Sequence, residues 1–393
     1  MLQRMVNSLR TIRSEMRLPP LAKAERALDS RAPMREDPGI DVAVSLASAW
    51  LCRAHDCSVS MDGGVARHFS LVSGWSESYP EVTGYIVPTM LRVAAHRGDP
   101  TLRERARRML DWLVSIQLPD GAFQASTIGA RPVIPTIFNT GQILIGLAAG
   151  AGEWGEQYLA PMHRAARWLV DAQDADGCWR RFASPFATPG EKTYYTHVAW
   201  GLLEAARVDP DTPYADAALA NIRWTIRQMR PNGWLDHCCV RDTTAPLTHT
   251  VGYALRGMLE AYRFARDPEF LTSCRLTADG TLTALRADGF LPGSLDANWR
   301  GTVKWSCLTG SVQIAICWLM LYELTGEERY RQAARAVNQF VRRTMHVEGD
   351  PDARGGIKGS LPVSGDYGKF EYLSWACKFF IDANLLEQEI DSR

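Results

Sequence analysis

Apolar and polar positions follow a helical period in six pairs of segments along the chain. The first segment of each pair has one apolar and one charged face, which predicts a helix that is half exposed to solvent. The second segment is apolar all round and rich in glycine and alanine, which predicts a buried helix. The first segments cover 42–55, 102–117, 158–173, 214–229, 269–285 and 329–346. The second segments cover 81–95, 139–149, 194–207, 249–264, 307–324 and 372–386.

A short glycine turn separates the two segments of each pair. The turn glycines lie 57, 56, 56, 56 and 67 residues apart and are Gly64, Gly121, Gly177, Gly233, Gly289 and Gly356. A period near 56 is too long for a common two-helix solenoid and suits a helical hairpin with a long loop. The sequence therefore predicts an all-α (α/α)6 toroid, six hairpins closed into an inner and an outer ring, over residues 39–393. Residues 1–38 are expected to form an N-terminal arm across the ring.

This repeat pattern resembles the (α/α)6 toroid superfamily, which includes six-hairpin glycosidases, polysaccharide lyases and C5-epimerase-like domains. The resemblance implies carbohydrate chemistry at one end of the ring. A second, weaker resemblance is to terpenoid-cyclase toroids. It lies in three turns that are similar to the Gln/Trp turn of squalene-hopene-type cyclases: Gln117 with Gly121, Gln173 with Gly177, and Gln228 with Gly233. The Asp-x-Asp-Asp and Asp-Asp-x-x-Asp motifs of isoprenoid chemistry do not occur in the sequence.

Charge and cysteine content narrow the setting of the protein. Lys plus Arg and Asp plus Glu both number 44, so no overall field favours nucleic acid or an anionic membrane. The nine cysteines are odd in number and scattered, which favours a reducing compartment. The sequence has no uninterrupted apolar stretch of about 18 residues and no secretory signal pattern. We expect a cytoplasmic protein without a membrane span.

Candidate site residues follow from a constant offset between each turn and the next buried helix. The buried helices begin 16 to 18 residues after the turn glycines, at Glu81, Asn139, Tyr194, His249, Cys307 and Leu373. In a closed ring these positions share one end. Helical spacing extends the polar stripes inward to Tyr85, Gln142, His197, Tyr253 and Arg256. Polar groups on buried helices are costly unless they are paired or line a cavity, so these residues are site candidates as well as candidates for ordinary core packing.

The residue types in this set suit chemistry on sugar acids. The proton beside a carboxylate is weakly acidic, so an enzyme must neutralise the carboxylate and place a base beside the carbon. Asn139 and Arg256 are the candidates for neutralising it. The predicted catalytic residues are Glu81, Tyr194, His197, His249 and Tyr253.

Hydrolysis of a glycosidic bond is the alternative chemistry, and it needs two carboxyl groups. Glu81 is the clearest acid at the predicted site, and its candidate partners are Asp236, Asp366 and Glu371.

Further residues are predicted to bind the substrate. Three tryptophans near the turns, Trp179, Trp234 and Trp305, suit stacking on sugar rings. The longer last repeat carries Lys358 and Tyr367 in a glycine-rich loop that is expected to cover the cavity. Tyr85, Asn139, Gln142 and Arg256 complete the predicted binding set.

A zinc site is a weaker alternative. His237, Cys238, Cys239, His249 and Cys307 all fall near turns or helix starts. The segment Trp305-Ser306-Cys307 is similar to one in lanthionine cyclases, toroids that hold zinc with two cysteines and a histidine. However, the sequence has no Cys-x-x-Cys or His-x-x-x-His spacing, so we predict no metal and no cofactor.

These observations favour a carbohydrate-active enzyme that acts on an oligo- or polysaccharide containing uronic acid. Its chemistry would be that of a lyase, an epimerase or a hydrolase. Two alternatives remain: an isoprenoid cyclase or transferase, and a non-catalytic glycan-binding module in polysaccharide assembly. The expected partners are the glycan and the polysaccharide-assembly machinery, and no nucleic acid.

Overall fold

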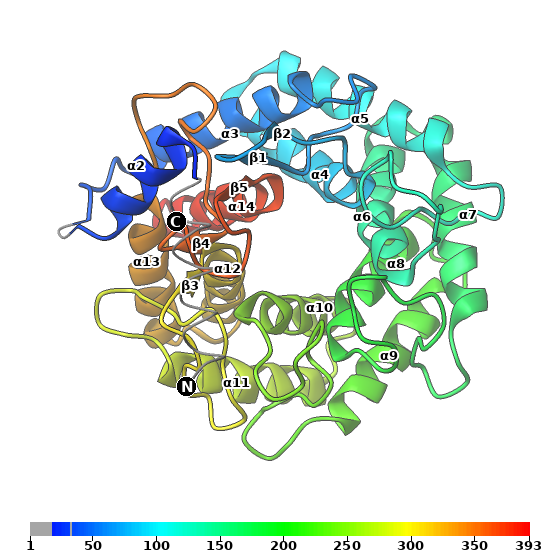
Figure 1. Ribbon diagram of the computed structural model, residues 1–393. Helices are drawn as coiled ribbons and strands as arrows, with labels where there is room; N and C mark the ends of the chain where they lie inside the picture. Colours follow the sequence, from blue (N-terminus) through cyan, green and yellow to red (C-terminus); the bar gives the residue numbers. More distant parts are fainter. Residues whose placement is uncertain (1–17, 32–33) are drawn as a thin grey trace, which may run out of the picture.

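The helices form two concentric rings in the computed structural model, which describes residues 18–31 and 34–393 (Figure 1). The outer ring contains α3 (Ile40–Asp56), α5 (Pro100–Ile116), α7 (Glu156–Ala172), α9 (Tyr214–Arg227), α11 (Pro268–Thr283) and α13 (Glu328–Arg342). The inner ring contains α4 (Pro80–Arg97), α6 (Ile137–Trp154), α8 (Thr196–Val208), α10 (Thr248–Ala265), α12 (Leu308–Thr325) and α14 (Ser374–Asp391). The predicted (α/α)6 toroid is confirmed, and each predicted segment corresponds to one of these helices.

The two rings differ in burial as their sequences predict. Every residue of α12 from Leu308 to Leu321 is buried, whereas α13 buries one face and leaves most of its charged residues on the other, Arg342 being buried. Within the described residues, α12 is the one helix long and apolar enough to cross a membrane by length and composition. However, 78% of that window is buried inside the ring, as expected of a core helix in a folded domain.

The connections between helices are unequal, and this asymmetry gives the ring two different ends. Links from an inner to the next outer helix are one to five residues long. Links from an outer to the next inner helix are 20 to 31 residues long. Because the hairpins repeat around the ring, all the long links gather where the inner helices begin. We call this end the mouth.

In every repeat but the first, the turn glycine packs against the backbone of the next outer helix; in the first, Gly63 packs against the Trp112 side chain of α5. Gly121 has a φ of +99°, and a Cβ on it would lie 2.4 Å from the carbonyl oxygen of Arg164 in α7. Gly355 has a φ of +82°, and its Cβ would lie 2.3 Å from the oxygen of Leu46 in α3. The last repeat therefore packs against the first as its predecessors pack against their neighbours, and the ring is closed.

The spacing analysis misplaced two turn glycines by one residue. In the first and last repeats the positive φ belongs to Gly63 and Gly355 and not to Gly64 and Gly356. In both repeats two glycines are adjacent, and the spacing could not tell which of them takes the left-handed conformation.

Short strands at the mouth reinforce the closure. β1 (His68–Ser70) pairs antiparallel with β2 (Gly74–Trp75) in its own repeat and with β5 (Glu371–Leu373) of the last repeat. A second pair joins β3 (Ser306–Cys307) to β4 (Ser360–Leu361). The β1–β5 pairing brings loops from opposite ends of the chain to one side of the mouth.

The described part of the N-terminal arm contains α2 (Pro20–Asp29), which lies beside the last repeat (Figure 1). Glu25 in α2 accepts hydrogen bonds from Lys358 at 2.8 Å and from His346 at 2.6 Å. Burial opposes ionisation of Glu25, but the His346 hydrogen bond and the Lys358 charge outweigh it and lower its pKa to about 2. Residues 1–17 of the predicted arm lie outside the described residues.

Ring closure predicts that Gly355→Ala destabilises the protein by about 3 kcal/mol or more, from backbone strain plus a steric clash. Gly326→Ala is the matched control, since Gly326 also has a positive φ (+71°) but no atom within 4 Å of its Cβ position. The control should lose only about 1–2 kcal/mol, the cost of the left-handed conformation. Urea unfolding of both variants measures the difference, and equal losses would contradict the closure role of Gly355.

Candidate active site at the mouth of the ring

The six inner helices place one side chain each at a common depth below the mouth. These side chains, which we call the axial layer, are Tyr85, Gln142, His197, Tyr253, Gln313 and Phe379, and none is more than 3% exposed. The rings of His197 and Tyr253 lie 4.4 Å apart, and that of Phe379 lies 5.9 Å from Tyr253. The axial layer fills the centre of the ring.

Two imidazole–amide pairs join neighbouring inner helices. His197 Nδ1 lies 2.6 Å from Gln142 Oε1, and His249 Nδ1 lies 2.7 Å from Gln313 Oε1. Because an amide oxygen only accepts hydrogen bonds, Nδ1 carries the proton in both histidines and Nε2 is left as a proton acceptor. The ring of Tyr253 lies between them, 4.4 Å from each imidazole.

Burial keeps both histidines neutral. It lowers the pKa of His249 to about 4, against the opposing hydrogen bond with Gln313. It also lowers the pKa of His197 well below its usual value, helped by the positive charges of Lys378 and Arg256. His249 is 9% exposed and His197 is fully buried, so His249 is the base that a ligand at the mouth can reach.

Glu81 supplies an acid at the same end of the ring, on α4. It lies in the first turn of α4, 8% exposed, and burial raises its pKa to about 7. The hydrogen bond from Tyr79 and the charge of Arg67 oppose that shift without cancelling it. A carboxyl group with this pKa retains a proton near neutral pH and is suited to donate it.

Residues from the first and last repeats complete the mouth. Arg67 lies 3.4 Å from Glu371 and 5.2 Å from the centre of the Trp375 ring. Trp375 Nε1 donates to the Tyr367 hydroxyl at 2.7 Å, and the Tyr367 ring lies 5.2 Å from that of His249. Tyr367 therefore lies at the mouth as predicted. Arg67 and Trp375 were missed because neither occupies the positions singled out by the turn offset.

Asn139 and Tyr194 also lie at the mouth. The Asn139 side chain bonds a neighbouring loop, and the Tyr194 side chain packs against another aromatic side chain. The Asn139 amide donates to the Gln124 carbonyl at 3.2 Å and accepts from the Thr136 hydroxyl at 3.0 Å. Tyr194 lies in a 3₁₀ turn, η1 (Thr193–Tyr195), with its ring 5.6 Å from that of Phe138. Their proposed chemical roles, and the binding role of the half-buried Trp305, stay predictions.

The placement of Arg256 at the mouth is wrong. Arg256 lies seven residues beyond His249 on α10, about 10 Å further along the helix axis at 1.5 Å per residue. It lines a pocket at the opposite end of the ring, below the axial layer. His249, Tyr253 and Arg256 do share one face of α10, but that face extends from the mouth to the opposite end of the ring.

Three predicted binding residues do not face a ligand. Lys358 is 1% exposed, and its ammonium is bonded to Glu25 and Asp29 of α2. Trp179 is fully buried and donates to the Leu169 carbonyl at 2.9 Å. Trp234 is 3% exposed and packs edge-on against Trp299. These side chains stabilise the turns and the arm, so their prediction as binding residues is wrong.

The three candidates for the second carboxylate lie in different surroundings. Asp236 is paired with Arg230 at 2.7 Å in an exposed turn, and Asp366 is exposed. Glu371 lies at the mouth beside Arg67, and burial raises its pKa. Of the three, only Glu371 has an ion-pair partner, Arg67, whose charge also acts on Glu81.

The described residues contain no group of three or more His, Cys, Asp or Glu side chains that could hold a metal ion. His237, one of the zinc candidates, lies 3.4 Å from Glu191, and Cys307 accepts a hydrogen bond from the Gly310 amide. All nine cysteines are free. The absence of a cofactor stays a prediction.

Comparison with solved structures shows the fold over nearly the whole chain. A sugar epimerase from a ruminal bacterium superposes with a TM-score of 0.73 at 12% identity, over 90% of this chain and 98% of that one. Unsaturated glucuronyl hydrolase from Bacillus sp. GL1 gives 0.70 at 16% identity, over 88% and 96%. Cellobiose 2-epimerase from Spirochaeta thermophila gives 0.68 at 16% identity, over 96% and 100%. The fold is that of the six-hairpin toroids.

Sequence comparison gives matches of a different kind. Residues 77–258 match the squalene-hopene cyclase C-terminal domain. The ent-copalyl diphosphate synthase of a Streptomyces species is 34% identical over 124 residues, which is 32% of this chain. The aligned part is only about a fifth, 21%, of that enzyme's length.

The Gln/Trp-like turns lie within the matched region, and the structure shows what they do. Gln117 Nε2 donates to the carbonyls of Gly121 and Pro161, both at 3.0 Å. Gln173 repeats this with Gly177 at 3.0 Å and Ala217 at 2.9 Å. Gln117 and Gln173 therefore tie their own turns to the next outer helix, whereas Gln228 donates to the Trp224 carbonyl of its own helix at 3.4 Å. This part of the similarity to cyclases is a scaffold feature and leaves the chemistry of the mouth open.

The raised pKa of Glu81 predicts a pH-dependent stability difference. A group whose pKa is raised on folding stabilises the protein fully below its unfolded pKa of 4.5, and this contribution is lost as pH rises through about 7. Relative to the wild type, Glu81→Gln should therefore gain up to about 3 kcal/mol between pH 4.5 and pH 8. Urea unfolding across this range measures the gain. The exposed control Glu104→Gln should show no such trend, and a flat difference for Glu81→Gln would contradict the raised pKa.

Proposed function

We propose that the protein is a carbohydrate-active enzyme that moves a proton on the uronic acid residue of an oligo- or polysaccharide. The observation that carries the proposal is that the mouth holds both a neutral histidine base, His249, and a buried carboxylic acid, Glu81, each at the start of an inner helix. The solved structures that share the fold include sugar epimerases and a glucuronyl hydrolase, which supports a sugar substrate.

In this proposal His249 takes the proton from the carbon beside the sugar carboxylate. Its hydrogen bond to Gln313 holds the ring with Nε2 free, and its low pKa keeps Nε2 unprotonated above about pH 4. The electron pair of the broken C–H bond moves into the carboxylate to form an enolate. Tyr253 packs against the imidazole and fixes its position.

The enolate has two outcomes that differ in where the next proton goes. If the C–O bond at the neighbouring carbon breaks, Glu81 protonates the leaving oxygen and the reaction is that of a lyase. If a proton returns to the carbon from the opposite face, the reaction is an epimerisation. Both need an acid that is protonated near neutral pH, which the raised pKa of Glu81 provides.

Arg67 is suited to hold the sugar carboxylate. Its side chain is 35% exposed at the mouth, and its distance of 3.4 Å to Glu371 is too long for a strong charge-assisted hydrogen bond. Positive charge near the carboxylate stabilises the enolate that develops on it. Trp375, which is buried under the guanidinium, holds Arg67 in place by a cation–π contact.

The proposal predicts solvent-deuterium uptake or an unsaturated product when the protein is incubated with uronic acid oligosaccharides in D₂O. Because His249 must be neutral and Glu81 protonated, the rate should rise through about pH 4 and fall through about pH 7. Mass spectrometry and ultraviolet absorbance measure the two products.

The variants His249→Gln and Glu81→Gln should each lose about 100-fold or more in rate. His96→Gln alters an exposed histidine at the end of α4 and should keep the full rate. No deuterium uptake, unsaturated product or new reducing end across a broad panel of uronic acid glycans would contradict the proposed chemistry.

A second candidate function is the cyclisation of an isoprenoid started by a proton from Glu81. It is favoured by the sequence matches to cyclases and by a protonated acid that lies among aromatic rings, which stabilise cations. To test it, the protein is incubated with squalene and, separately, with geranylgeranyl diphosphate. The expected result is a cyclic product of the same mass as the substrate. A cyclic product together with inactivity on glycans would establish this function in place of the first.

A further inference from the structure

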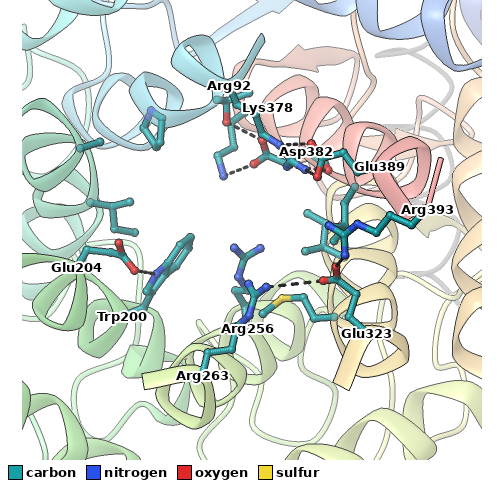
Figure 2. A pocket seen from close by; sticks show the side chains of 17 residues that line it. Arg92, Trp200, Glu204, Arg256, Arg263, Glu323, Lys378, Asp382, Glu389 and Arg393 are labelled. Atoms are coloured by element: carbon teal, nitrogen blue, oxygen red, sulfur yellow. Dashed lines mark hydrogen bonds and ion pairs between the residues drawn. The ribbon is translucent and has the colours of Figure 1, made fainter. Parts of the chain in front are cut away.

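A pocket of about 330 Å³ opens at the end of the ring opposite the mouth. Figure 2 shows charged side chains from several inner helices converging on this hollow, with Trp200 forming one wall. Arg263 and Arg393 are 40% and 66% exposed, so the pocket is open to solvent. Its volume is in the range of small-molecule sites.

The axial layer separates this pocket from the candidate active site. On α10 the order along the helix is His249, Tyr253, Arg256 and Arg263, and the last two line the pocket. Tyr253 is 2% exposed and packs against His197 and Phe379. A ligand in the pocket is therefore distinct from one at the mouth.

Three of the five cations in the pocket are neutralised by a carboxylate partner. The pairs Arg92–Glu389, Lys378–Asp382 and Arg393–Glu323 all have distances of 2.7 Å. Charge-assisted hydrogen bonds at this length are strong and leave little attraction for a ligand.

Of the other two cations, Arg263 has no carboxylate within hydrogen-bond distance, whereas Arg256 is paired with Glu260 but keeps one guanidinium nitrogen for a ligand. Arg263 lies 3.7 Å from Glu323 and 3.8 Å from Glu260, both beyond hydrogen-bond distance. Arg256 bonds Glu260 through Nε and Nη2 at 2.9 and 2.8 Å, which leaves Nη1 for another acceptor. Figure 2 shows both guanidinium groups directed into the hollow.

The remaining acid of the pocket, Glu204, is engaged by neighbouring donors, including Arg207 at 3.3 Å. Glu204 accepts a hydrogen bond from Trp200 Nε1 at 2.8 Å, and burial together with the nearby Glu260 raises its pKa. Trp200 itself lies under the Arg256 guanidinium at 4.4 Å. The free donors of the pocket are therefore cationic, and its wall is aromatic.

We infer that this pocket is a second binding site, which takes a small molecule bearing a carboxylate or phosphate group between Arg256 and Arg263 with its body against Trp200. Guanidinium groups bind both kinds of oxyanion through paired N–H donors, so the chemistry is shared. Trp200 also contacts the axial layer, with its ring 5.0 Å from that of His197.

Calorimetric titration at low ionic strength tests the site with inorganic phosphate and, separately, with malonate as a dicarboxylate. We expect saturable binding of at least one of them with a Kd of about 1 mM or tighter. Arg263→Gln should weaken it about tenfold, since it removes a charged donor from a largely exposed position. Arg263→Lys, which keeps the charge but not the paired donors, should give an intermediate Kd.

The matched control is Arg223→Gln, which removes an exposed arginine from the outer helix α9 and should leave the Kd unchanged. The indole N–H resonance of Trp200, assigned by its loss in Trp200→Phe, should shift on titration of wild type and not of Arg263→Gln. The proposal is overturned if neither anion binds saturably, or if Arg263→Gln binds as the wild type does. It does not depend on the activity at the mouth, because every measurement is of binding.

Discussion

The structure depends on the contact between the last repeat and the first. The inner helices are buried over most of their length on all sides, so each needs neighbours on both flanks and an outer helix behind it. Only a closed ring provides these for all six. The approach of Gly355 to the backbone of α3 and the pairing of β1 with β5 make that closure. The same closure brings Arg67 from the first repeat to Glu371 from the last, so the mouth exists only because the ring is complete.

Burial at the centre of the ring sets the chemistry of its polar groups. Desolvation moves the pKa of a carboxyl group up and that of an imidazole down, so both become neutral. Glu81 and His249 show these opposite shifts within the same ring of helices. A neutral acid and a neutral base at one end of the ring result from one cause, the exclusion of water by the inner helices.

Most of the fold was predictable from the sequence, because the repeat period and the two kinds of helix are both visible in it. The mouth was predictable in part. Glu81, Asn139 and His249 were found because the offset from turn to helix is nearly constant. Gln313, on α12, bonds His249 in the same way as Gln142 bonds His197. It was missed because helical spacing connects His249 only to residues of its own helix.

The incorrect predictions concern direction along a helix and contacts between distant segments. Arg256 shares a face with His249, but helical periodicity does not say at which end of the ring a side chain emerges. Lys358 is bound by Glu25 of α2, a helix that lies outside the repeat and about which the repeat carries no information. Arg67 reaches the mouth through a strand pairing between the two ends of the chain, which one sequence alone does not reveal.

The axial layer has a topological consequence for any long ligand. The fully buried rings and amides of six helices block the central hole, so a polymer has no route from one face of the protein to the other. A chain that enters the mouth must stop at His249 and withdraw by the same path. A long ligand at the mouth can therefore present only one of its ends to the axial layer.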